Sequence, residues 1–179
     1  SNLTLLPCTE LPQGNFDLVL LQIPKNLSLL EYQLHHMSPH LSENTVILSG
    51  GMVKHLPRSA TDLINNILGD TKAQLAWKKA RIFETRYNPE REIPVYQPLS
   101  NFQLEKTPFT IVNHPNVFSR QSLDIGTRLF LAHIPSGHYQ HIIDLGCGNG
   151  VVGLMAAQKN PDAKVTCTDE SHLATQSAK

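Results

Sequence analysis

The sequence predicts an α/β fold, because strand-like and helix-like stretches alternate in two separate regions of the chain. The first region opens with an apolar run within residues 15–22, which has the character of a buried strand. The second contains a strand-like stretch at 141–143 that leads directly into a glycine-rich run. Its order of strand, glycine turn, helix and strand is half of a nucleotide-binding βαβ unit.

The first region is predicted to fold as strand, helix, strand, helix and strand. Its helices are predicted from apolar residues at helical spacing. The second helix is expected to begin at a capping box formed by Ser59 and Asp62. Gly50 and Gly51 are expected to form a turn. The predicted elements are a strand at 15–22, a helix at 27–41, a strand at 45–48, a helix from Ser59 to Leu68 and a strand at 74–87.

The second region is predicted to begin after a linker. Residues 89–108 contain several prolines and charges, a composition typical of linkers. Residues 109–112 and 117–118 are expected to pair as a hairpin, followed by a helix at 122–134. The glycine run is followed by a helix ending at Asn160-Pro161, a strand at 164–168 and a helix from Glu170.

The glycine run has the composition of a backbone cradle for a nucleoside ligand. It consists of Asp144, Leu145, Gly146, Cys147, Gly148, Asn149 and Gly150. Its glycines can adopt positive φ and carry no Cβ, so a ligand can lie directly against the backbone. Asp169 follows the last glycine by nineteen residues, where nucleoside-binding domains place a carboxylate for ribose hydroxyls. A glycine turn capped by Asp144 without any ligand is the alternative.

Asp144 indicates which nucleoside is bound. The dinucleotide motif needs a glycine at position 151, where this chain has valine, and a carboxylate at the strand end would repel a pyrophosphate. S-adenosylmethionine carries no phosphate, and its ammonium and sulfonium would be attracted by Asp144. We therefore expect S-adenosylmethionine as the cofactor and rank a nicotinamide cofactor far behind. Cys147 is expected to fill the turn rather than to react.

Three stretches carry a resemblance to a known family. Residues 118–128, from Phe118 to Arg128, together with the glycine run, resemble the entry to the catalytic domain of bacterial ribosomal RNA guanine-N2 methyltransferases. Within this group, residues 113–118, residues 76–81 and Ile23-Pro24-Lys25 are more similar to the large-subunit methyltransferase G branch than to the small-subunit methyltransferase C branch.

The resemblance implies two partial Rossmann-like methyltransferase domains. The second half of a degenerate N-terminal copy spans 1–88, and the start of the catalytic copy spans 109–179, with a linker at 89–108 between them. The implied reaction is methyl transfer to the exocyclic N2 amine of a guanine in 23S rRNA. The alternatives are the 16S rRNA enzyme and a noncatalytic RNA-binding or assembly fragment.

The resemblance also implies that this chain holds no catalytic residue. Active members carry an Asn-Pro-Pro motif, which is replaced by Ile23-Pro24-Lys25 in the first copy and is expected beyond Lys179 in the second. We therefore expect a fragment that is inactive alone and able to self-associate through uncovered apolar faces. The alternative for the first copy is that Pro24 simply ends a strand and Lys25 is solvated.

Further contacts are expected on both regions. Phe118, Gly126 and Thr127 belong to a stretch that the family uses as a wall of the cofactor site, with ordinary packing as the alternative. RNA contacts are expected from basic and aromatic residues, with solvated lysines and a packed indole as the alternative. These residues are Trp77, Lys78, Lys79 and Arg81 on one predicted strand, and Arg120.

Composition sets the remaining limits. Lysine and arginine number 15 and the acidic residues also 15, so an RNA partner requires a local basic patch. No apolar run is long enough to span a bilayer, and three scattered cysteines favour reduced thiols, hence a cytoplasmic protein without a membrane partner. His35, His36 and His40 lie close together without a zinc-binding pattern, so no metal is expected.

Overall fold

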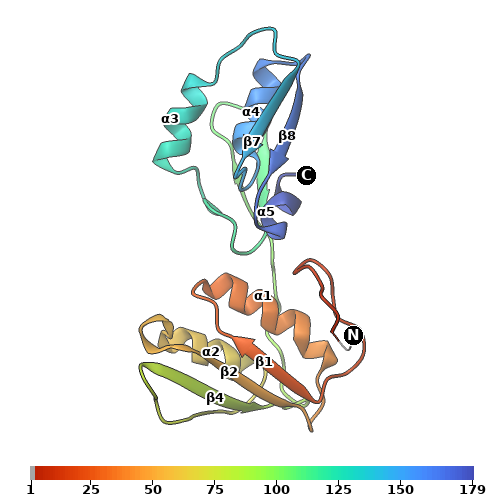
Figure 1. The fold of residues 1–179 in the computed structure, drawn as a ribbon, viewed down its shortest axis with the longest axis vertical. Coiled ribbons are helices and arrows are strands. Elements are labelled where there is room, and N and C mark those ends of the chain that lie inside the picture. Colours follow the sequence, from red (N-terminus) through yellow and green to blue (C-terminus); the bar gives the residue numbers. More distant parts are fainter. Residues whose placement is uncertain (1–2) are drawn as a thin grey trace. The chain divides into compact units, whose positions relative to one another are not determined.

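The computed structural model describes residues 3–179, which form two compact units. One unit consists mainly of Glu10–Tyr96 and the other mainly of Gln97–Lys179. Both contain β-strands and α-helices (Figure 1), which confirms the predicted α/β fold.

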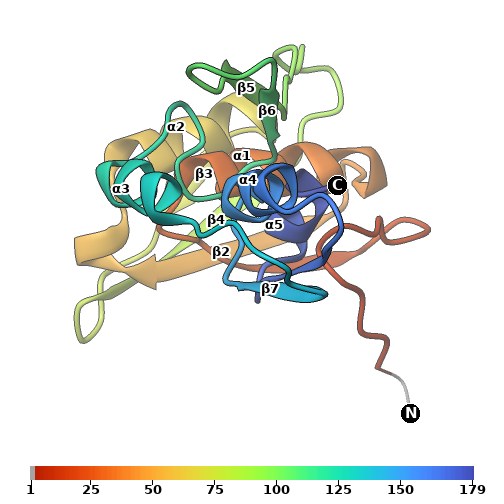
Figure 2. The same ribbon diagram turned by 90° about the horizontal axis from the view of Figure 1, so that it is seen from above.

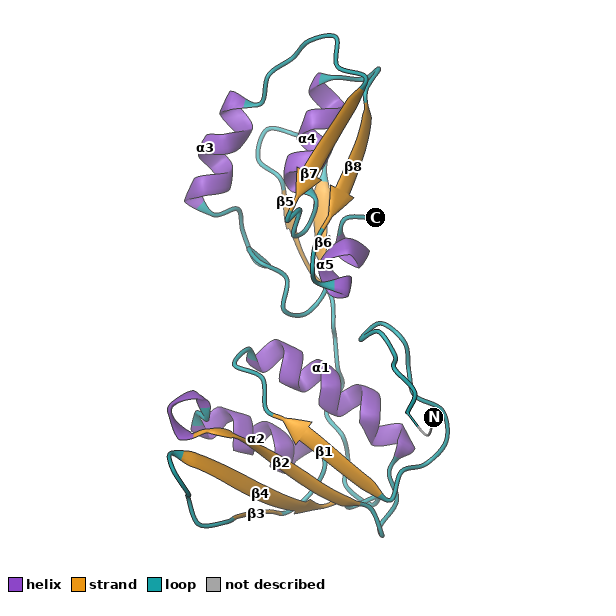
Figure 3. Ribbon diagram, in the orientation of Figure 1, coloured by secondary structure: helices purple, strands orange, loops and turns teal. Residues whose placement is uncertain are grey.

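The first unit is built on a four-stranded sheet with the order β1-β2-β4-β3. β1 (Leu18–Gln22) and β2 (Val46–Met52) run parallel, whereas β4 (Ala80–Arg86) is antiparallel to β2 and to β3 (Thr71–Ala73). α1 (Leu27–Met37) follows β1 and α2 (Arg58–Ile67) follows β2 (Figure 3). The sheet is therefore mixed, with an antiparallel hairpin on one side of a parallel pair.

The core of the first unit lies between its helices and its sheet. Leu30 and Leu34 of α1, four residues apart, and Ile64 of α2 are fully buried, as is Ile47 of β2. α1 begins after Asn26, whose Oδ1 accepts hydrogen bonds from two backbone N–H groups of the first turn. It ends before the predicted limit, because the segment around Pro39 forms a short 3₁₀ turn instead, Ser38–His40.

Two predictions about this unit are wrong. Gly50 and Gly51 do not form a turn but continue β2, opposite Ile82 and Arg81 of β4. Strand β4 passes so close that a Cβ on Gly50 would lie 3.1 Å from the carbonyl oxygen of Arg81. Ser59 is not the cap of α2, which begins at Arg58 after Pro57, because the extended backbone of Pro57 already ends the preceding segment.

The expected strand at 74–87 is a hairpin with its turn at Lys78 and Lys79. The Trp77 N–H donates to the Ala80 carbonyl (2.9 Å), and the Ala80 N–H donates back to the Trp77 carbonyl (2.8 Å). Both lysines have positive φ, 44° and 67°, as in a type I′ turn. Such turns favour Asn-Gly, so the sequence does not predict a turn at Lys78-Lys79.

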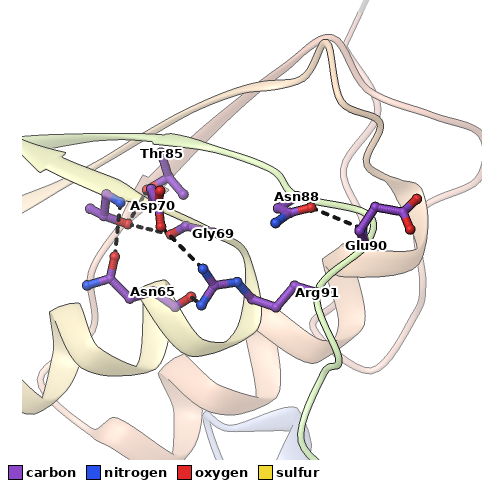
Figure 4. Close-up of polar contacts among 8 residues, drawn as sticks. Asn65, Gly69, Asp70, Thr85, Asn88, Glu90 and Arg91 are labelled. Atoms are coloured by element: carbon purple, nitrogen blue, oxygen red, sulfur yellow. Dashed lines mark hydrogen bonds and ion pairs between the residues drawn. The ribbon is translucent and has the colours of Figure 1, made fainter.

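The segment after β4 is anchored to the first unit by Arg91. Its Nη1 donates to the Asn65 carbonyl oxygen (2.7 Å), and its Nη2 pairs with Asp70 Oδ1 (3.2 Å) (Figure 4). Ile93 packs against the core, and Tyr96 stacks on His35 with ring centroids 4.4 Å apart. Residues 89–96 of the expected linker are therefore part of the first unit.

The second unit contains an antiparallel hairpin and a parallel pair of strands. β5 (Ser100–Gln103) pairs with β6 (Thr110–Asn113), a hairpin seen in Figure 2. β7 (His141–Leu145) runs parallel to β8 (Lys164–Thr168). The helices are α3 (Ile125–His133), α4 (Val151–Lys159) and α5 (His172–Ser177).

The pairing of β6 corrects the predicted hairpin. Residues 109–112 were expected to pair with 117–118, but β6 pairs with β5, inside the segment expected to be a linker. The prolines around β5 conceal this short strand. Asn113 at the end of β6 is fully buried and donates from Nδ2 to the Arg120 carbonyl, so the chain leaves the sheet there instead of turning back.

Two polar side chains of the second unit connect α4 to the end of α3. Lys159 Nζ donates to the carbonyl oxygens of Leu131 (3.1 Å) and Ile134 (2.9 Å). Asn160 is buried, donates to the Pro135 carbonyl (3.1 Å) and accepts from the Gly137 N–H (2.9 Å).

Within residues 3–179, no helix combines the length and apolar character needed to cross a bilayer.

Candidate cofactor site

The glycine run forms a tight loop between β7 and α4. Gly146, Gly148 and Gly150 all have positive φ, at 73°, 54° and 79°. The N–H groups of Gly146 and Cys147 donate to the carbonyl oxygen of Thr168, at 2.8 and 2.9 Å. The loop is thus fixed against the end of β8, and its conformation depends on residues that adopt left-handed backbone angles without strain.

The glycines of this loop serve two different purposes. A Cβ built on Gly146 or Gly148 would meet no other atom within 4 Å, so the space beside these residues is open. A Cβ on Gly150 would lie 2.7 Å from the Cβ of Ala178. The first two glycines therefore leave open space beside the backbone, and the third allows close packing with Ala178 after α5.

Asp144 lies near the end of β7 with its carboxylate held by α4. Its Oδ2 accepts a hydrogen bond from the N–H of Gly153 (2.9 Å). Burial raises the pKa of Asp144, the hydrogen bond from Gly153 opposes this, and the neighbouring charge of Asp169 raises it further. The site thus disfavours the ionised form of Asp144, and a bound cation would stabilise that form.

Asp169 follows β8, and its carboxylate contacts both the glycine loop and the turn before α5. Its Oδ2 accepts from the Gly148 N–H (2.9 Å), and its Oδ1 accepts from the Ser171 N–H (2.8 Å). A carboxylate oxygen can accept more than one hydrogen bond, so these contacts fix the side chain while leaving acceptor capacity. Asp169 therefore shapes the glycine loop as well as facing the same space.

Cys147 is buried in the loop, in the manner of a small packing residue. Burial, with smaller contributions from Cys167, Asp144 and Asp169, raises the pKa of Cys147 to about 11. Burial likewise raises the pKa of Cys167 on β8. Both thiols are therefore protonated near neutral pH and poorly suited to act as nucleophiles.

A cavity of about 210 Å³ lies beside the loop and brings most of the predicted cofactor residues together. Gly126 and Gly150 are not part of its lining. Asn149 presents a buried Nδ2 that has no hydrogen-bond partner, so the loop holds an unused donor. The predicted residues that line the cavity are Phe118, Thr127, Asp144, Gly146, Cys147, Gly148, Asn149 and Asp169.

The wall of the cavity also contains residues that sequence reasoning missed. Ser119 and Leu123 line it, and Ser119 has φ of 57°. Its Oγ donates to Asp124 Oδ1 (3.1 Å), while Asp124 Oδ2 caps α3 by accepting from the Thr127 N–H (3.1 Å). The available signal in the sequence was a serine five residues before the aspartate that caps α3.

The predicted RNA contacts do not form one cluster. Trp77, Lys78, Lys79 and Arg81 belong to the hairpin of the first unit, whereas Arg120 belongs to the second. The Arg120 guanidinium donates to the carbonyl oxygen of Pro98, and so anchors a loop of its own unit.

The histidines considered for metal binding are used in ring contacts. His35 stacks on Tyr96, His36 lies against Tyr32 and His40 meets the edge of Phe16. In the described part of the chain, no group of three or more His, Cys, Asp or Glu residues is arranged to hold a metal ion.

Comparison with known proteins gives two family models and a series of close relatives. Residues 1–89 match the RLMG N-terminal domain, and residues 108–179 match the methyltransferase small domain. Ribosomal RNA large subunit methyltransferase G of Ectopseudomonas mendocina is 44% identical over 97% of this chain, and that of Pseudomonas aeruginosa (strain UCBPP-PA14) is 45% identical over 97%. The chain belongs to the ribosomal RNA large subunit methyltransferase G family.

The chain spans about half the length of the curated relatives in this family, 46% of each. The T. thermophilus 16S rRNA N2 guanine methyltransferase RsmC, solved in complex with AdoMet and guanosine, has a similar fold. The TM-score is 0.79 at 19% identity, covering 95% of this chain and 48% of that chain.

In this member of the family, Gly153→Ala is expected to destabilise the second unit through Cys167. The new Cβ would lie 2.5 Å from Cys167 Sγ and 3.3 Å from Asp144 Oδ2, so the free energy of unfolding should fall by about 1–3 kcal/mol. Thermal unfolding measures the effect. Cys167→Ala removes the colliding sulfur, so the double variant should regain part of the loss. A double variant no more stable than Gly153→Ala would contradict this steric explanation.

Proposed function

We propose that this chain supplies the S-adenosylmethionine site of a 23S rRNA guanine-N2 methyltransferase. One observation carries the proposal: the Asp144 carboxylate, the open backbone at Gly146 and Gly148, and Asp169 all border a single cavity. Family membership supports the same function, because the relatives are named large subunit methyltransferases.

The residues present fit the chemistry of this cofactor. Burial raises the pKa of Asp144, and among residues 3–179 no ion pair compensates its charge. S-adenosylmethionine carries an ammonium and a sulfonium that could do so. Gly146 and Gly148 leave room where any side chain would fill the cradle, and Asn149 holds an unpaired donor. We assign Asp144 to the positive end of the cofactor and Asp169 to its ribose hydroxyls.

The cofactor supplies an electrophilic methyl group when it is bound. The exocyclic amine of guanine is a weak nucleophile, because its lone pair is delocalised into the ring, so acceptors that polarise and orient it must contribute to the rate. Residues 1–179 contain no Asn-Pro-Pro run that could provide such acceptors. In this proposal the chain positions the methyl donor but is inactive alone, and the complete protein acts on ribosomal RNA in the bacterial cytoplasm.

The proposal is tested in two steps. Calorimetry on this chain should detect binding of S-adenosylmethionine and no comparable binding of NAD, which distinguishes the two nucleoside classes. The complete protein, given S-adenosylmethionine labelled on its methyl group, should then label 23S rather than 16S rRNA at guanine N2, as identified by nucleoside mass spectrometry. Binding of NAD alone, or labelling of 16S rRNA alone, would reject the assignment.

A further inference from the structure

Residues 114–120 form a loop whose two ends meet at the end of β6. Asn113 Nδ2 donates to the carbonyl oxygen of Arg120 (3.1 Å), so the chain comes back to the side chain of Asn113 after seven residues. Compact surface loops with adjacent ends are frequently functional. We call residues 114–120 the strap.

The Arg120 end of the strap is held by three contacts. The Arg120 carbonyl oxygen accepts from Asn113 and also from Ser100 Oγ of β5 (3.1 Å), which uses both lone pairs of this oxygen. The Arg120 guanidinium donates to the carbonyl oxygen of Pro98, just before β5. The hairpin of β5 and β6 therefore fixes this end of the strap.

The other end of the strap is held by α5. The His114 N–H donates to Ser177 Oγ (2.9 Å), and this hydroxyl donates in turn to the carbonyl oxygen of Leu173 (2.9 Å). The next residue after Ser177 is Ala178, which lies against Gly150 of the glycine loop. The end of α5 is thus in contact with both the strap and the glycine loop.

The strap carries two residues of the cofactor cavity. Pro115 and Val117 are buried beneath it, whereas Phe118 is 71% exposed and lines the cavity together with Ser119. Asn116 and Ser119 have positive φ, at 61° and 57°. Residues other than glycine keep such backbone angles only where the surrounding contacts determine them. The contacts at the two ends of the strap therefore set where Phe118 and Ser119 meet the cavity.

Stability does not explain an asparagine at position 113. The Asn113 side chain is fully buried, and within residues 3–179 its Oδ1 has no hydrogen-bond partner. An unpaired buried carbonyl destabilises the folded state, so an apolar residue of the same size would suit this core better. The amide of Asn113 nevertheless supplies the donor that closes the strap.

We propose that Asn113 is a positioning residue of the cofactor site, which acts through the strap. Asn113 does not line the cavity itself. It holds the carbonyl of Arg120, directly after Ser119, and so keeps Phe118 and Ser119 in the orientation that they have in the cavity wall. A wall that is already ordered binds its ligand more tightly, because less motion is lost on binding. The inference rests on the proposed function, since S-adenosylmethionine is the ligand that this wall would contact.

Two variants test the contact at Arg120. Asn113→Leu removes the donor and keeps the size of the side chain, so calorimetry on this chain should show S-adenosylmethionine binding weakened roughly 2- to 12-fold, the loss of one hydrogen bond. Hydrogen exchange without the cofactor, followed by mass spectrometry, should be faster by a similar factor in the peptide that covers the strap. Ser100→Ala removes the second donor from a partly buried position and should give the same two effects, even if Asn113→Leu failed to fold.

Asn160→Ala is the matched control. Asn160 is another buried asparagine of the second unit, but it lies at the end of α4 remote from the glycine loop and does not line the cavity. It bonds to Pro135 and Gly137, so its loss should lower the unfolding temperature more than Asn113→Leu does, without changing the affinity for S-adenosylmethionine. A purely structural role of Asn113 cannot produce this reversal, in which the less stable variant binds the cofactor more tightly.

The outcomes separate this inference from the proposed function. The proposal is overturned if Asn113→Leu and Ser100→Ala leave the affinity for S-adenosylmethionine unchanged, or if Asn160→Ala loses as much affinity as they do. If the natural chain itself does not bind S-adenosylmethionine, the proposed function fails. Faster exchange of the strap in Asn113→Leu would then still support the role of Asn113 in holding the strap, and unchanged exchange would reject it.

Discussion

Asp144→Asn is expected to weaken S-adenosylmethionine binding roughly 10- to 150-fold, the loss typical of a hydrogen bond to a charged group. Asparagine keeps an oxygen that can accept the Gly153 N–H, so the loop geometry should survive while the negative charge is removed. Calorimetry with the cofactor measures the loss. The effect follows from electrostatics, because in the proposed complex the Asp144 carboxylate faces a cationic ligand.

The same carboxylate gives the binding a predictable dependence on pH. Burial raises the pKa of Asp144 in the free protein, whereas a bound cation would favour the ionised form and lower it. Affinity should therefore be constant near neutral pH and fall as the pH drops through the pKa of the free protein. The dependence should disappear in Asp144→Asn. Affinity that is independent of pH in the natural chain would show that Asp144 does not meet the positive end of the ligand.

Stability gives an independent control for this variant. A carboxyl group whose pKa is raised by folding stabilises the folded state less as it ionises, so the free protein gains stability as the pH falls through that pKa. Asp144→Asn removes the buried charge, so at neutral pH its unfolding temperature should be no lower than that of the natural chain. If the variant had a lower unfolding temperature and also failed to bind S-adenosylmethionine, Asp144 would have a structural role instead.

The sequence places the residues of the candidate cofactor site near one another because the arrangement of the glycine loop is local. The positive φ values of Gly146, Gly148 and Gly150 and the position of Asp144 depend on a few consecutive residues. Asp169 could be placed because the spacing of a βαβ unit is narrow. Gly126 does not line the cavity, whereas Ser119 does. Which face of α3 points to the cavity, and how the loop before it runs, depend on packing that the local sequence does not encode.

Long-range pairing explains what the sequence does not predict. β5 is short and flanked by prolines, and only its contact with β6 makes it a strand. Gly50 and Gly51 resemble a turn, but β4 passes close enough to exclude larger residues and extends β2 through them. The Lys78–Lys79 turn has positive φ at both residues, where Asn and Gly are preferred, so turn preferences do not locate it.

Gly69→Ala is expected to destabilise the first unit more than any other change of a single methyl group discussed above. Gly69 follows α2 with φ of 140°, and a Cβ there would lie 2.3 Å from the carbonyl oxygen of Arg86. The neighbouring backbone cannot retreat easily, because the Asn88 N–H donates to the Leu68 carbonyl (2.8 Å). Backbone strain and steric overlap together should cost about 2–5 kcal/mol, a fall in unfolding temperature of roughly 5–15 °C.

Gly14 provides the matched control for this prediction. It also has positive φ, at 84°, but a Cβ there would meet no atom within 4 Å, so Gly14→Ala carries backbone strain without overlap. Thermal unfolding followed by the fluorescence of Trp77, which lies in the first unit, reports both variants on one scale. Gly14→Ala should lose about 1–2 kcal/mol at most. If the two variants unfolded at the same temperature, the close approach of β4 to the end of α2 would not be the reason for glycine at position 69.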